Sequence, residues 1–65
     1  MRTGSVTEFD VWTGLGVITL DNDAPVSFHC VAITDGTRRI DVGQPVVAAL
    51  SFHLGRQVAS VVHKR

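Results

Sequence analysis

The apolar residues of this chain recur at every second position within short stretches, and clusters of Gly, Pro, Asn and Asp separate these stretches. Alternation with a period of two is typical of strands that bury one face, and no helical period continues over roughly 11 residues. The pattern therefore predicts an all-β chain. We expect strands at residues 5–11, 15–20, 26–30, 45–52 and 57–62.

Alternation also assigns a direction to each side chain of the second strand. Its residues fall into two sets by face, with Gly16, Ile18 and Leu20 on one side and Leu15, Val17 and Thr19 on the other. The first strand departs from strict alternation, because Val6 and Phe9 stand an odd number of residues apart. A β-bulge near Glu8 reconciles these two apolar positions.

Turn residues separate the predicted strands. Residues 11–14 and 53–56 are short turns that each contain a glycine, and residues 21–25 are rich in Asp, Asn and Pro. The connection over residues 31–42 is longer. Five short strands with one long connection favour a small closed barrel, because closure removes the exposed edges of an open sheet.

Composition supports a single small domain over residues 1–65. Hydrophobic residues make up 45% of the chain, which is too high a fraction for a disordered segment. The chain has three Phe, one Trp and no Tyr, so its core must depend on aliphatic side chains. The expected core comprises Val6, Ile18, Val26, Ile33, Ile40, Val46 and Val61, with the larger Phe28 accommodated by the small Ala48.

The charges balance, with six basic and six acidic residues. Neutrality argues against strong non-specific binding of nucleic acid, which depends on many contacts between phosphates and Lys or Arg. The charges are unevenly distributed, however. The second half of the chain holds Arg38, Arg39, Arg56, Lys64 and Arg65, and the first half holds Asp10, Asp21 and Asp23. This order predicts a polarised surface.

The single cysteine, Cys30, has no partner for an internal disulfide, which fits a reducing compartment. The chain shows no charged-then-apolar leader and no apolar run of ~18 residues. We therefore expect a soluble, cytoplasmic protein that does not enter a membrane.

Catalytic and metal-binding patterns are absent from the sequence. Cys30 and the three histidines form no CxxC or HxxxH pair, and adjacent strand residues point to opposite faces. Ser, His and Asp occur without the context of a catalytic triad. A chain of this size is also too small for a deep pocket. We expect no enzyme activity, no metal and no cofactor.

Two segments carry a more specific pattern. Residues 13–18 read Thr-Gly-Leu-Gly-Val-Ile, and residues 26–30 read Val-Ser-Phe-His-Cys. With residues 4–10, 31–33, 36–40, 42–44 and 57–61, in this order and spacing, they resemble the motifs of the bacterial cold-shock proteins, a branch of the OB-fold. The two corresponding family motifs are Lys-Gly-Phe-Gly-Phe-Ile and Val-Phe-Val-His-Phe. The resemblance covers nearly the whole chain.

This resemblance implies a small five-stranded antiparallel OB-fold barrel, cold-shock-like in topology. It also implies binding of single-stranded RNA or DNA, with a role in the regulation of transcription or translation and in the stress response. In that family, aromatic rings pave the sheet surface, and each stacked base contributes about 1–3 kcal/mol. The present chain retains Phe9 and His29. It replaces the other family aromatics with Glu8, Leu15, Val17, Ser27, Cys30 and Thr37, so we expect weak binding.

The resemblance also implies roles for individual residues. Phe9, Leu15, Val17 and His29 would form the base-contacting platform, and Arg38, Arg39 and Arg56 would contact phosphates from adjacent loops. Each role has an alternative. Phe9 would instead pack the barrel, and His29 would be an exposed strand residue without a ligand. Leu15 and Val17 would lie beneath the 31–42 connection, and the arginines would be solvated.

Trp12 stands at the tip of the first turn, where the family has no aromatic residue. Its large π-face makes it a candidate stacking platform displaced from the strands. We nevertheless expect the ring to fold back on the barrel.

A second hypothesis places this chain in a different functional class. Leu15, Val17 and Cys30 would form an apolar face that binds a protein partner or a second copy of the chain, and nucleic-acid binding would be lost. An exposed apolar patch usually marks an interaction site. The zero net charge and the carboxylate of Glu8 favour this hypothesis.

Overall fold

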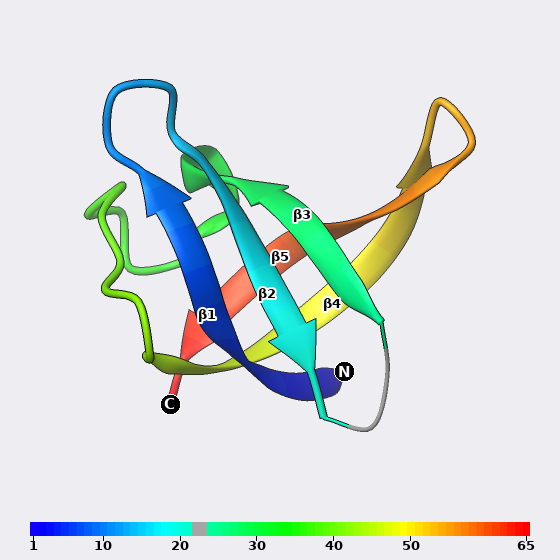
Figure 1. Cartoon of the computed structure of the whole chain (residues 1–65), viewed down its shortest axis with the longest axis horizontal. Helices are drawn as coiled ribbons and strands as arrows, with labels where there is room; N and C mark the ends of the chain where they lie inside the picture. Colours follow the sequence, from blue (N-terminus) through cyan, green and yellow to red (C-terminus); the bar gives the residue numbers. More distant parts are fainter. Residues whose placement is uncertain (22–23) are drawn as a thin grey trace.

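Five strands close into a barrel in the computed structural model, which describes residues 1–21 and 24–65. The elements are β1 (Arg2–Asp10), β2 (Leu15–Leu20), β3 (Pro25–His29), the 3₁₀ helix η1 (Cys30–Ala32), β4 (Pro45–His53) and β5 (Arg56–Lys64). The order around the barrel is β1-β2-β3-β5-β4 (Figure 1). This confirms the prediction of an all-β, OB-fold-like barrel. The turn predicted over residues 21–25 includes residues 22 and 23, which lie outside the described part.

One pair of strands runs parallel, and the geometry of the ring requires it. β1 is antiparallel to both β2 and β4, β2 is antiparallel to β3, and β4 is antiparallel to β5. A closed ring with an odd number of strands cannot alternate direction throughout. β3 and β5 are therefore parallel, pairing Ser27 with Val58 and Phe28 with Ala59.

Two β-bulges adjust which residues face the core. The bulge predicted near Glu8 is confirmed, because the register of β1 against β2 shifts between Val6 and Glu8. A second shift was not predicted. Val61 pairs with Ala49, but Leu50 pairs with Ala59, so β5 holds one extra residue at Ser60.

The second bulge corrects the predicted core. Val61 was expected to be buried, but it is only half-buried, and Val62 is fully enclosed instead. The extra residue in β5 reverses the inward and outward alternation beyond it, whereas strict alternation from the buried Ala59 places Val61 inward. The other predicted core residues are all buried: Val6, Ile18, Val26, Ile33, Ile40 and Val46.

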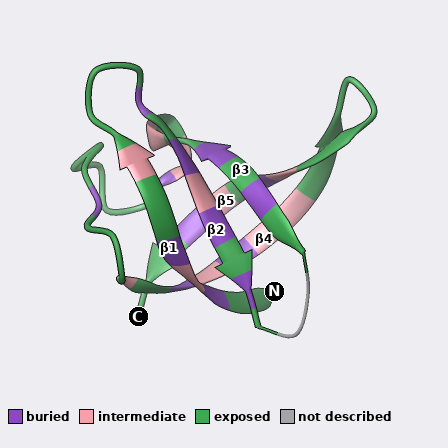
Figure 2. Ribbon diagram, viewed as in Figure 1, coloured by how far each residue is buried: buried purple, intermediate pink, exposed green. Residues whose placement is uncertain are grey.

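As expected, Phe28 is buried in the core cluster, which also contains the fully buried Ala48. Gly16 provides further room. A Cβ atom at Gly16 would lie 2.6 Å from two ring carbons of Phe28 and 2.8 Å from the carbonyl oxygen of Glu8. Figure 2 shows the result on β2 and β3, where buried residues alternate with exposed or half-buried ones.

The 31–42 connection runs beside β1, on the side of the barrel opposite the β4–β5 hairpin (Figure 1). Its turn is held by Asp35, whose carboxylate accepts hydrogen bonds from the backbone nitrogen of Thr37 at 3.0 Å and from its hydroxyl at 2.8 Å. The same carboxylate forms an ion pair with Lys64 at 2.8 Å. In the described part of the chain, no helix has the length and apolarity needed to cross a membrane.

Candidate ligand-binding surface

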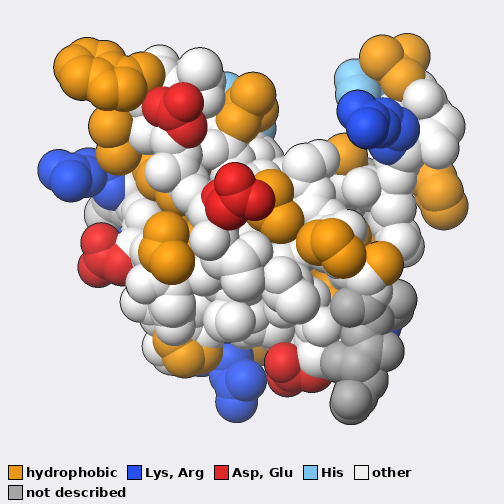
Figure 3. All heavy atoms as spheres, viewed as in Figure 1, with side chains coloured by type: hydrophobic (Ala, Val, Ile, Leu, Met, Phe, Trp, Pro, Cys, Tyr) orange, Lys and Arg blue, Asp and Glu red, His pale blue; other side chains and the backbone are white. Residues whose placement is uncertain are grey.

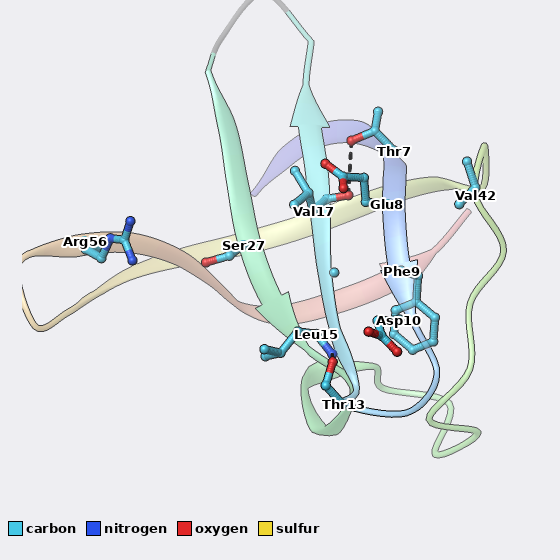
Figure 4. A pocket seen from close by; sticks show the side chains of 11 residues that line it. Thr7, Glu8, Phe9, Asp10, Thr13, Leu15, Val17, Ser27, Val42 and Arg56 are labelled. Atoms are coloured by element: carbon cyan, nitrogen blue, oxygen red, sulfur yellow. Dashed lines mark hydrogen bonds between the residues drawn. The ribbon is translucent and has the colours of Figure 1, made fainter.

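The outward faces of β1, β2 and β3 form an open hollow of about 840 Å³. We call the side chains of Glu8, Asp10, Leu15, Val17 and Ser27 the β1–β3 surface. Figure 4 shows it from close by, with the hairpin on one side and the 31–42 connection on the other. The structure thus places two of the predicted contact residues on a single concave sheet surface.

Strand register arranges this surface in two rows of side chains. Glu8, Val17 and Ser27 are cross-strand partners and make the first row. Asp10, Leu15 and His29 make the second. Each row therefore starts with a carboxylate on β1 and continues with an apolar side chain on β2. A single strand of nucleic acid laid across either row would meet one negative charge.

The 31–42 connection does not cover Leu15. Val42 is the residue of that connection that lines the hollow, and it stands at its border (Figure 4). Leu15 is 55% exposed, and Val17 is half-buried. The interpretation that placed Leu15 beneath this connection is therefore wrong, and the apolar floor is accessible to a ligand.

Phe9 serves both the barrel and the hollow. It is half-buried and packs against the core, where its ring stacks on Phe28 with centroids 6.0 Å apart and planes inclined by 13°. The same residue lines the hollow beside β2. The two alternatives drawn from the sequence are thus combined in one side chain.

His29 ends β3 and is exposed, but a local hydrogen bond restrains its ring. Its Nδ1 accepts a hydrogen bond from the backbone nitrogen of Val31 at 3.3 Å, which caps η1. Accepting this bond leaves the ring hydrogen on Nε2. His29 lines a second, more apolar groove of about 370 Å³, which adjoins the hollow at Leu15 and Ser27.

Cys30 does not belong to the β1–β3 surface. β3 ends at His29, so Cys30 begins η1, is half-buried and packs against the core. A Cβ atom at Gly14 would lie 2.7 Å from its Sγ atom. The predicted apolar face of Leu15, Val17 and Cys30 is therefore reduced to Leu15 and Val17, because Cys30 alternates with the inward residues Val26 and Phe28.

Trp12 is 93% exposed, so the expectation that its ring folds back on the barrel is wrong. The turn is tight: the Asp10 carboxylate accepts a hydrogen bond from the backbone nitrogen of Trp12 at 2.8 Å, and its carbonyl accepts one from Gly14 at 2.8 Å. This turn projects beyond the ends of β1 and β2 (Figure 1). The ring therefore has no barrel surface beneath it.

The three predicted arginines lie on two sides of the molecule. Arg56 starts β5 and lines the hollow from the hairpin (Figure 4). Arg38 and Arg39 are exposed on the 31–42 connection, on the opposite side of the barrel. Against the carboxylates of Glu8 and Asp10, Arg56 is the cation that the structure places at the border of the hollow.

The tip of the β4–β5 hairpin was not recognised in the sequence. Phe52 is 76% exposed and Leu54 is 89% exposed. Figure 3 shows hydrophobic side chains gathered on this hairpin and on the β1–β2 turn, with a hollow between them. The sequence held one signal for this exposed tip. Leu54 stands directly before Gly55, and the first position of a two-residue turn usually holds Asn, Asp or Gly.

Among the residues that the structure describes, no three His, Cys, Asp or Glu side chains are grouped so that they could hold a metal ion. The chain matches no protein-family model and no curated protein sequence.

Proposed function

We propose that this barrel binds single-stranded RNA or DNA weakly on the β1–β3 surface. The observation that supports the proposal is the open, partly apolar sheet surface of an OB-fold-like barrel, bordered by Arg56. The resemblance of residues 13–18 and 26–30 to the cold-shock motifs supports the same role. By that resemblance, the protein would regulate transcription or translation without catalysing a reaction.

The chemistry of the surface sets the expected strength. Leu15, Val17 and Phe9 offer apolar contact to bases but little stacking area. Trp12, at the tip of the neighbouring turn, offers a large exposed π-face. Each base that stacks on an aromatic ring contributes about 1–3 kcal/mol of binding free energy. Stacking on Trp12 would therefore supply part of the affinity that is lost because the strands carry few aromatic rings.

Electrostatics would contribute little affinity. Each phosphate contact to a single strand adds about −0.7 to the slope of log Kobs against log salt. With Arg56 as the phosphate contact we expect a slope near −0.7, and near −2 if a longer strand also reaches Arg38 and Arg39. Glu8 and Asp10 oppose any strand laid close to β1.

The test is a titration of labelled oligo-dT and of a mixed-sequence RNA at low salt, followed by anisotropy. Trp12 is the sole tryptophan, so its fluorescence reports on one position. We expect a Kd near 10 μM or tighter, of the order found for non-specific binding, with quenching of Trp12. Trp12→Ala should weaken the binding and leave the unfolding midpoint unchanged. Absence of binding at about 1 mM protein, where even very weak complexes form, would overturn the proposal.

A second candidate function is contact with another protein. The large apolar side chains of Trp12, Phe52 and Leu54 are each more than three-quarters exposed, and Trp is one of the residues enriched at interface hot spots. The net charge of zero favours this candidate as well. The fluorescence of Trp12 separates the two, because a protein partner would shift the emission to shorter wavelength, whereas a stacked base would quench it.

A further inference from the structure

Leu54 occupies a position that neither the turn nor the barrel favours. It is the first residue of a two-residue hairpin turn, with φ of 52°, and Gly55 follows with φ of 77°. Side chains larger than those of Gly, Asn or Asp are unfavourable in this left-handed region. The Leu54 side chain is also almost wholly exposed. Local structure therefore gives no reason for a leucine, and such outliers point to a role in function.

The hairpin tip combines apolar and basic groups. Phe52 and Leu54 provide exposed apolar surface, and Arg56 provides a cation two residues further on. The chain has no Asp or Glu after Asp41, so no acidic residue of β4 or β5 offsets this charge. A surface that matches the hairpin must therefore be apolar and acidic.

The β1–β3 surface has this composition. Its floor is formed by Leu15 and Val17, and Glu8 and Asp10 stand at its β1 side. We propose that the hairpin tip of one copy docks on the β1–β3 surface of a second copy, with Leu54 on the apolar floor and Arg56 facing Glu8. Complementary charge then selects this partner.

The arrangement in the single copy allows this contact to be reciprocal. The hairpin and the β1–β3 surface border the same hollow, and Arg56 lines it in its own chain (Figure 4). A two-fold axis through the hollow therefore brings each hairpin to the opposite surface. Such an interface is closed, so it produces a dimer and not a filament.

The size of the contact makes the dimer weak. Stable interfaces bury roughly 800 Å² on each partner, which is about a fifth of the 4210 Å² that this chain exposes. A contact confined to the hairpin tip and one sheet face is small against that requirement, so we expect a weak dimer. The dimer covers the surface proposed for nucleic acid, so the two ligands compete; this consequence, unlike the dimer itself, depends on the proposed function.

The experiment is sedimentation equilibrium of the full chain without nucleic acid, from about 10 μM to about 1 mM, where weak dimers form. We expect a monomer–dimer equilibrium. Arg56→Glu and Glu8→Arg should each weaken it by about tenfold, and the double variant should restore it. Arg39→Glu, on the far side of the barrel, is the matched charge control and should have no effect.

Leu54→Asn keeps the test valid if the charge variants unfold. Asn suits the left-handed position, so this variant should raise the unfolding midpoint while it weakens dimerisation by about tenfold. A structural role of Leu54 cannot produce these opposite changes. A monomer at every concentration, or a dimer that Leu54→Asn leaves unchanged, would overturn the proposal. Oligonucleotide binding is measured separately on Leu54→Asn, so the proposed function can fail or succeed independently.

Discussion

The inward and outward sides of β2 and β3 are set by different requirements. Inward, Ile18 and Phe28 are buried and Gly16 leaves space for the Phe28 ring, so each size depends on its neighbours. Outward, Leu15 and Ser27 face solvent, where the barrel sets few demands on side-chain size. Along each strand, residues that are constrained by core packing therefore alternate with residues that are available to contact a ligand.

Because of this difference, the barrel can tolerate substitutions that alter the chemistry of its outward surface. The inward residues form the packed core that supports the barrel and its hollow, and the outward residues decide what the hollow binds. Substitutions inward should change stability without changing the chemistry of binding, and substitutions outward should do the reverse. The following predictions test that separation, beginning with the largest effect.

Phe28→Ala should lower the free energy of unfolding by about 3–5 kcal/mol, because it removes a buried ring and leaves a cavity. Leu15→Ala, on the outward side of the neighbouring strand, should change it by no more than about 0.5 kcal/mol. Urea unfolding of the two variants measures both values. Comparable losses would show that the outward side also carries the fold.

Gly16→Ala should lower the free energy of unfolding by about 1–3 kcal/mol, although it adds a single methyl group. The added Cβ would lie 2.6 Å from the Phe28 ring and 2.8 Å from the carbonyl oxygen of Glu8. Urea unfolding is again the measurement. Gly36→Ala adds a methyl group that meets no atom within 4 Å, but the φ of +78° at Gly36 disfavours any side chain, so this variant measures the cost of the left-handed backbone without a clash.

Pairing Gly16→Ala with Phe28→Val separates the two contacts. The smaller side chain relieves the clash with the ring but not the clash with the backbone at Glu8. The double variant should therefore lose less stability than the two single losses added together. Strict additivity would mean that Gly16 and Phe28 do not share space, contrary to the inward packing described above.

The fold could be predicted from the sequence because the residues that form the core carry two signals, the alternation of apolar positions and one break in that alternation. Alternation gave β2 with its bounds and its two faces, and the odd spacing of Val6 and Phe9 gave the first bulge. The second bulge left no such trace. Val61 and Val62 are both apolar and adjacent, so the pattern cannot say which of them faces the core.

The candidate site was less accessible to sequence reasoning. The outward direction of Leu15 and Val17 follows from period two, and it is confirmed. The position of Trp12 depends on how far a turn projects, and the separation of Arg56 from Arg38 depends on the path of the 31–42 connection. Local residue types determine neither how far a turn projects nor which path a long connection takes. The exposed hairpin tip arises because β4 and β5 extend beyond the barrel, which composition does not reveal.

Introducing aromatic rings on the outward side should raise oligonucleotide affinity if the proposed function holds. We expect the triple variant Leu15→Phe, Val17→Phe and Ser27→Phe to bind oligo-dT at least tenfold more tightly, about 1.4 kcal/mol, even with strong non-additivity among the stacked bases. Anisotropy titration measures the affinity. The unfolding midpoint in urea should change little, because these side chains face the hollow. Unchanged affinity would mean that bases do not bind on this surface.

The smallest effect concerns one outward contact that does bear on the fold, the pair of Asp35 and Lys64. The hydrogen bond from Lys64, followed by those from Thr37, lowers the pKa of Asp35 from 3.8 to about 2. Because the folded pKa lies below the unfolded one, the contact stabilises the barrel above pH 3.8 and is lost as the pH falls toward 2. Asp35→Asn should make the melting temperature less dependent on pH over this interval. Asp41→Asn leaves the Asp35–Lys64 pair intact and should keep the pH dependence. The difference should shrink in high salt, because the pair is exposed and screened. If the unaltered chain and Asp35→Asn had identical melting curves between pH 5 and pH 2, the Asp35–Lys64 pair would not contribute to the stability of the barrel.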